Sequence, residues 1–131
     1  TIPNTPTLQK PVVLAYNERK EKLLQNIEVT SDSLVLAFYD NGMVDGDSIS
    51  VYVNNERIIS GARLKTVATK KTIAIPANTD IVILLVADNL GTLPPNTGLM
   101  TITDGDKSYQ VNFSADMQTN ASITIRRKKT E

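Results

Sequence analysis

Short segments in which apolar and polar side chains alternate constrain the fold of this chain more than any other feature. In Asp47–Asn54, for example, every second residue from Ile49 to Val53 is apolar. This period of two places the apolar side chains on one face of a β-strand. Other alternating segments, or apolar runs of strand length, are Ile27–Val29, Leu34–Tyr39, Ile58–Ile59, Ile73–Ile75, Ile81–Ala87, Leu99–Thr103, Tyr109–Phe113 and Ala121–Ile125. The pattern predicts about eight or nine short strands.

Residues that favour turns separate these segments. Asn54–Asn55 suits a two-residue hairpin, because asparagine tolerates a positive φ, and Asp104–Asp106 is a second hairpin signal. Pro76 ends the segment Ile73–Ile75, since proline has no backbone N–H to donate. A chain of 131 residues fits one domain. We therefore predict an all-β fold, an antiparallel two-sheet β-sandwich of the Ig-like or jelly-roll-like kind.

The start of the chain has a different composition. Residues 1–15 contain three prolines among Thr and Asn, which predicts an extended linker or tether before a sandwich domain at 16–131. Tyr16–Leu24 contains good helix formers but is short, so it forms either a helix or an extended lead into the first strand. The sequence begins without Met or a signal peptide, so we expect a mature or excised fragment.

Composition argues against several classes of function. Lys and Arg total 14, as do Asp and Glu, so no net charge attracts the chain to nucleic acid or anionic lipid. The absence of Cys and His excludes Cys/His zinc sites, thiol nucleophiles and Ser-His-Asp triads. The longest apolar run, Ile81–Ala87, is far shorter than the roughly 20 residues of a membrane-spanning helix, so no spanning segment is predicted.

Acidic residues gather at the predicted turns. Asp40, Asp45 and Asp47 lie within eight residues, and Asp88 follows another strand. Calcium binds about six to eight oxygen atoms, mostly from carboxylates and carbonyls, so these four aspartates are candidate ligands of a Ca²⁺ ion. Their spacing does not match an EF-hand loop. The other interpretation is that they only form turns, in which Asp side chains accept hydrogen bonds from nearby backbone amides.

Two further features suggest a ligand other than a metal. Tyr52 shares a predicted face with two serines, so an exposed Tyr52 would stack on a sugar ring; the alternative is a cross-strand contact on a half-solvated sheet. The loop Leu90–Asn96, with Pro94 and Asn96, would shape one end of the sandwich or form a binding edge. A glycosidase would need two carboxylates facing each other across a cleft, which turn residues do not indicate, so no catalytic residue is predicted.

Three separated blocks, Phe38–Asn54, Ala87–Thr97 and Thr103–Asp106, occur in an order that resembles a family of C-terminal β-rich modules in secreted or lipid-anchored proteins of Bacteroidetes bacteria. The likeness covers most of the chain. One departure is Asn55, where the family pattern more often has glycine, and asparagine adopts the same turn. The resemblance implies an exported, non-enzymatic module without a settled activity, tethered to an upstream domain or lipid anchor by the proline-rich start.

Together these features predict an exported, non-catalytic binding or structural module. Its expected location is extracellular, periplasmic or on the outer cell surface, and Ca²⁺ bound at Asp40–Asp47 is its one candidate cofactor. Two alternatives stay open. One is a carbohydrate-binding module that contacts a glycan through Tyr52 or the loop Leu90–Asn96. The other is a protein-interaction module that pairs with a partner through a sheet edge.

Overall fold

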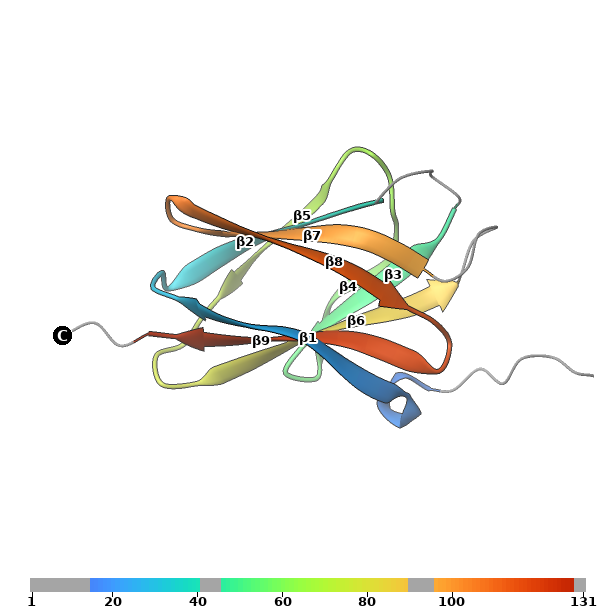
Figure 1. Ribbon diagram of the computed structural model, residues 1–131, viewed down its shortest axis with the longest axis horizontal. Helices are drawn as coiled ribbons and strands as arrows, with labels where there is room; N and C mark the ends of the chain where they lie inside the picture. Colours follow the sequence, from blue (N-terminus) through green and yellow to red (C-terminus); the bar gives the residue numbers. More distant parts are fainter. Residues whose placement is uncertain (1–14, 41–45, 90–95, 129–131) are drawn as a thin grey trace, which may run out of the picture.

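The computed structural model describes residues 15–40, 46–89 and 96–128, which form two β-sheets packed face to face (Figure 1). This confirms the predicted two-sheet sandwich. A short 3-10 helix at Tyr16–Glu18 precedes the strands. The strands are β1 (Lys20–Val29), β2 (Ser33–Asp40), β3 (Ser48–Val53), β4 (Glu56–Arg63), β5 (Thr69–Ala74), β6 (Asp80–Asn89), β7 (Asn96–Asp104), β8 (Lys107–Ala115) and β9 (Thr119–Arg127).

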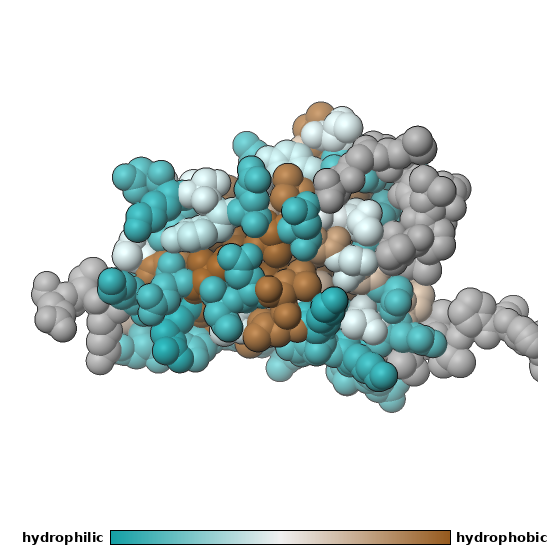
Figure 2. Space-filling model, in the orientation of Figure 1, coloured by the Kyte–Doolittle hydropathy of each residue, from teal (hydrophilic) through white to brown (hydrophobic). Residues whose placement is uncertain are grey.

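The five-stranded sheet has the order β1-β9-β6-β3-β4 and the four-stranded sheet the order β5-β2-β7-β8. All neighbouring strands are antiparallel except β1 and β9, which run parallel. The edge strands β1 and β8 lie on the same side of the sandwich, facing the viewer in Figure 1. Figure 2 shows apolar atoms in the middle of this side, and Leu23 on β1 is 51% exposed.

The core lies between the sheets because each strand turns every second side chain inward. On β2, for example, Leu34, Leu36 and Phe38 are almost fully buried, and burial of one such side chain stabilises the fold by about 1.5–3 kcal/mol. The largest side chains in this core are Leu34, Leu36, Phe38, Ile49, Leu64, Ile75, Ile81, Ile83, Leu85, Met100, Ile102 and Ile123.

The local predictions have clear outcomes. Asn54 and Asn55 both have positive φ, at 49° and 71°, and form the predicted hairpin between β3 and β4. In Tyr16–Leu24 only the three-residue 3-10 helix is helical, and the chain is extended from Lys20 onward. The predicted tether lies almost entirely outside the described residues. No helix among the described residues has the length and apolar character needed to cross a bilayer.

The two ends of the sandwich carry different polar residues. We call one the Asn96 end, where β2 and β6 finish and β3 and β7 begin; it is on the right in Figure 1. The other is the Asp104 end, where β7 and β9 finish and β2 and β6 begin. Each end contains a buried polar side chain, Asn96 at the first and Asp104 at the second.

Candidate functional site

Three polar side chains close the core at the Asn96 end. Asp40 shares the inward face of β2 with Phe38, and Asp47 stands two residues before the buried Ile49. The period of two therefore directs both carboxylates between the sheets. Asn96, the first residue of β7, is 0% exposed, and Asp47 is 1% exposed. The sequence placed Asp40 and Asp47 among the candidate cation ligands, and the fold brings both to one end of the core.

Backbone hydrogen bonds hold the two aspartates beside each other. The amide of Leu64 donates to the carbonyl of Asp47 at 3.0 Å, and the amide of Asp40 donates to the carbonyl of Lys65 at 2.8 Å. Both aspartates are thus anchored to one dipeptide after β4. Asp40 is also in register with Gly98 on β7. Because Gly98 is two residues from Asn96, β7 brings the amide side chain to the same end.

The orientation of the Asn96 amide is fixed by its donors. Its Nδ2 donates to the carbonyls of Ser48 at 2.8 Å and Asn89 at 3.1 Å. These bonds turn Oδ1 the other way, where it is buried and accepts no hydrogen bond. Oδ2 of Asp40 is also buried without a hydrogen-bond partner. Buried acceptors without partners are uncommon, and each costs about 1–3 kcal/mol, so this pair of atoms calls for an explanation.

Gly46 leads into the site with a φ of 87°, which favours glycine. A side-chain carbon there would lie 3.0 Å from Nη2 of Arg63. The Arg63 guanidinium therefore lies close to the backbone just before Asp47. It is a positively charged group of the chain itself that is near this end. Asp45, the remaining predicted ligand on this loop, lies outside the described residues.

An oxygen-only group of this kind suits a hard divalent cation. Carboxylate and amide oxygens are typical Ca²⁺ ligands, whereas Zn²⁺ prefers nitrogen and sulfur. No group of three or more acidic, His or Cys side chains among the described residues could hold a metal. The group at the Asn96 end contains two carboxylates, Asp40 and Asp47, and its third member is the amide of Asn96.

The structure separates Asp88 from this group. The register between β3 and β6 shifts at Ser48 and Ile49, which leaves Asp88 without a partner on β3. Its Oδ2 accepts a 2.8 Å hydrogen bond from Oγ of Ser50, a residue whose side chain does not share the inward face of Ile49. Asp88 is thus on the outer face of the five-stranded sheet, and its predicted place among the Asp40–Asp47 ligands is corrected.

The predicted sugar-contacting residues have different environments from those expected. Tyr52 is only 6% exposed, because the ring of Tyr16 is stacked on it at 4.0 Å between centroids. Of the two alternatives for Tyr52, the exposed ring is therefore wrong. Asn96 is buried inside the end of the sandwich and not on a surface edge, while Pro94 lies outside the described residues.

At the opposite end, Asp104 is 2% exposed, and both oxygens of its carboxylate accept hydrogen bonds. Its carboxylate accepts hydrogen bonds from the amides of Thr30 at 3.0 Å and Ser31 at 2.9 Å. Burial alone would raise the pKa of Asp104, but hydrogen bonds from the Ser31 side chain and these amides, together with the charge of Lys107, hold this pKa below its ordinary value of 3.8.

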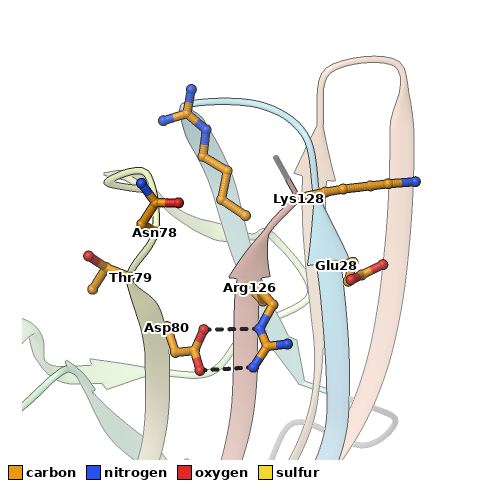
Figure 3. Close-up of a pocket in the computed structure, with 7 residues that line it drawn as sticks. Glu28, Asn78, Thr79, Asp80, Arg126 and Lys128 are labelled. Atoms are coloured by element: carbon orange, nitrogen blue, oxygen red, sulfur yellow. Dashed lines mark hydrogen bonds and ion pairs between the residues drawn. The ribbon is translucent and has the colours of Figure 1, made fainter. Parts of the chain in front are cut away.

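The Asp104 end also has a surface pocket, shown in Figure 3. Two of the residues that line it, Asp80 and Arg126, lie side by side on β6 and β9, and the Arg126 guanidinium donates paired hydrogen bonds of 3.1 and 3.3 Å to the Asp80 carboxylate. The two side chains are 53% and 65% exposed, and exposed ion pairs of this kind bind and stabilise weakly. Asn78 and Thr79 add polar groups at the rim. We find no buried group there that lacks a partner among the described residues, so this pocket is the weaker candidate site.

Comparison with known proteins gives no family for this chain. No family model matches it, and neither curated proteins nor solved structures yield a match.

Proposed function

We propose that this protein is a non-catalytic β-sandwich module that binds one Ca²⁺ ion at the Asn96 end, through Asp40, Asp47 and Asn96. The observation that carries the proposal is Oδ1 of Asn96. It is fully buried, its orientation is set by two hydrogen bonds from Nδ2, and it accepts none itself. A cation bound beside Asp40 would supply the missing partner.

The ion would act as a link between the sheets. Asp40 belongs to the four-stranded sheet, and Asp47 leads into the five-stranded sheet. Asn96 starts β7 in the four-stranded sheet while its amide donates to Ser48 in the other. A ligand that binds only the folded state at 100 times its Kd stabilises that state by about 2.7 kcal/mol.

An exported location agrees with this chemistry. Extracellular modules use Ca²⁺ sites with dissociation constants of about 10⁻⁴–10⁻³ M, because their surroundings supply millimolar calcium. The resemblance of the sequence blocks to C-terminal modules of secreted or lipid-anchored proteins stays an expectation, and it implies the same location. Secretion assays with the complete protein, followed by protease treatment of intact cells, would test it: protection from the protease would contradict an outer-surface location.

Calorimetric titration with CaCl₂ tests the binding proposal. We expect one ion per chain, weaker binding of Mg²⁺ because it demands a smaller octahedral shell, and loss of binding in Asp40→Asn. Asp104→Asn is the matched control, since it makes the same change at a buried aspartate of the opposite end, and it should bind normally. No heat and no Ca²⁺-dependent change in the wild-type protein would reject the proposal.

A further inference from the structure

The outer face of the five-stranded sheet is covered over β9, β6 and β3. Side chains on this face point away from the core, yet Tyr52 is 6% exposed and Val86 3%. On the same face, Asn120 is 1% exposed and Ser122 0%. Outward side chains of a two-layer sandwich normally meet solvent. Their burial therefore indicates that another part of the chain covers them.

Residues 15–19, which we call the strap, lie on this face. The Tyr16 ring is stacked on Tyr52 with an interplanar angle of 13°. The Tyr16 carbonyl accepts a 2.8 Å hydrogen bond from Nδ2 of Asn120, and Arg19 donates to the carbonyl of Ala87 at 2.9 Å. In Figure 1 the blue start of the chain hooks below the five-stranded sheet. The strap is thus fastened at β3, β6 and β9.

The strap leaves polar atoms beneath it unsatisfied. Oδ1 of Asn120 and Oγ of Ser122 are buried and have no hydrogen-bond partner. Ser122 is in register with Leu84, which is in register with Tyr52. An aromatic ring, an apolar strip and two unsatisfied polar atoms therefore lie across three adjacent strands. A cover that had only a structural role would be expected to satisfy these atoms.

Charged groups border the same area. Arg57 donates to the Tyr52 hydroxyl from Nε at 3.0 Å and from Nη2 at 2.8 Å. Asp88 accepts from Ser50, whose Oγ also accepts from the amide of Gly61 at 3.0 Å. The site thus combines one cation and one anion with an aromatic ring. No excess of either charge is present among these residues to select an ionic ligand.

We propose that this face is a saccharide-binding site that the Tyr16 ring occupies in the free protein. A pyranose ring has an apolar face of C–H groups that packs on an aromatic ring, and its hydroxyls both donate and accept hydrogen bonds. It would replace Tyr16 on Tyr52 and satisfy Asn120 and Ser122. The proposal is independent of the Ca²⁺ site, so it is tested at constant calcium.

Occupation by the strap sets the apparent affinity. A ligand that needs the open face binds in proportion to the fraction of molecules in which the strap is displaced. Tyr16→Ala removes the competing ring and should tighten binding about tenfold or more. The reason is that a ligand of the wild type must first break the stacking of Tyr16 on Tyr52, and the variant has no such stacking to break. Tyr52→Ala removes the platform and should abolish binding.

Affinity electrophoresis in gels that contain soluble β-glucan, xylan, galactomannan or pectin provides the test. We expect Tyr16→Ala to be retarded by at least one polysaccharide more strongly than the wild type, and the Tyr16→Ala/Tyr52→Ala double variant not to be retarded. Tyr109→Ala is the control. Tyr109 lies on β8, where its hydroxyl donates to the carbonyl of Glu28, so this variant should behave as wild type.

A folded Tyr16→Ala variant that no polysaccharide retards would overturn the proposal and leave the strap as a structural cover. Circular dichroism and melting establish folding. If Tyr16→Ala does not fold, NMR titration of the wild type with oligosaccharides of the same polysaccharides decides the matter. Shifts of the Tyr16, Tyr52 and Ser122 signals support the site, and unchanged signals reject it.

Discussion

The two ends of the sandwich use buried aspartates in different ways. At the Asp104 end, the carboxylate accepts hydrogen bonds from the amides of Thr30 and Ser31 and has a lowered pKa. At the Asn96 end, buried oxygens of Asp40 and Asn96 accept no hydrogen bond. The buried carboxylate of the first end is satisfied within the chain, whereas we propose that the second end takes a cation as its partner. Similar turn-forming sequences can therefore leave buried carboxylate oxygens with hydrogen-bond partners or without them.

The largest expected effect is on calcium dependence. Ca²⁺ at 100 times its Kd, which is about 10 mM for a site with a Kd of about 10⁻⁴ M, should raise the melting temperature over that in EDTA by about 10 °C, which corresponds to a stabilisation of about 2.7 kcal/mol in a domain of this size. Asp40→Asn should abolish this difference because it removes a charged ligand. Differential scanning calorimetry in the two buffers measures both, and equal melting curves for the wild type would remove the contrast between the ends.

The second prediction concerns the stability that Asp104 contributes at the Asp104 end. Asp104→Asn replaces an acceptor with an amide group that faces the N–H donors of Thr30 and Ser31, so it should destabilise the fold by about 1–3 kcal/mol. The loss should be the same in EDTA and in Ca²⁺. Urea unfolding in both buffers tests this, and a calcium-dependent loss would show that the two ends are coupled.

The pH dependence of the Asp104 end follows from its lowered pKa. The unfolded chain binds a proton on Asp104 more tightly than the folded protein, so the carboxylate stabilises the fold above its ordinary pKa of about 3.8. This stability is lost as the pH falls through the lowered pKa of the folded state. The difference in unfolding free energy between wild type and Asp104→Asn should be constant above about pH 5 and shrink below about pH 4. A difference that does not change with pH would contradict the assignment.

A smaller effect is expected at Asp40 when no ion is present. In EDTA, Asp40→Asn should melt within about 2 °C of the wild type, because the replaced oxygen has no hydrogen bond to lose. Asp104→Asn in the same buffer should melt several degrees lower. Side-by-side thermal melts give the comparison, and an equal loss in both variants would mean that Asp40 has an internal partner like that of Asp104.

The smallest effect belongs to the exposed pair in Figure 3. Asp80→Asn removes the partner of Arg126, but both side chains are more than half exposed, so the melting temperature should change by about 1 °C or less. The same melts in 0.5 M NaCl, roughly five times the ionic strength at which the Debye length is about 10 Å, should show no difference at all. A loss as large as that of Asp104→Asn would mean that exposure is a poor guide to the strength of this pair.

Much of the fold could be predicted because it depends on local pattern. Period-two alternation identifies strands such as β3, and the Asn54–Asn55 turn identifies the hairpin to β4. The parallel pairing of β1 with β9 could not be predicted in this way, since alternation does not reveal which distant strand is a neighbour or in which direction it runs. The short helical bias of Tyr16–Leu24 yielded to strand pairing over most of its length.

The candidate site could be predicted in part. Asp40 and Asp47 belong to inward-facing series that the sequence contains, and Asn96 stands at an even spacing from the buried Met100. That spacing indicated a third inward-facing polar side chain. Its oxygen becomes a candidate ligand only when the hydrogen bonds of the Asn96 amide are known, because they show that Oδ1 has no donor. Asp88 was misassigned because a shift in register between β3 and β6 places it on the other face. The alternative of an exposed Tyr52 failed because its cover, Tyr16, comes from outside the strands that pair with β3.

The most direct test of the central claim is a crystal structure of the protein grown in millimolar CaCl₂. We predict a single strong density peak between Asp40, Asp47 and Asn96, with oxygen ligands at about 2.3–2.6 Å that include Oδ1 of Asn96. An anomalous signal in long-wavelength data would identify the peak as calcium. A water molecule, or the guanidinium of Arg63, bound to these oxygens in the presence of calcium would contradict the account and make the Asn96 end a second structural cap.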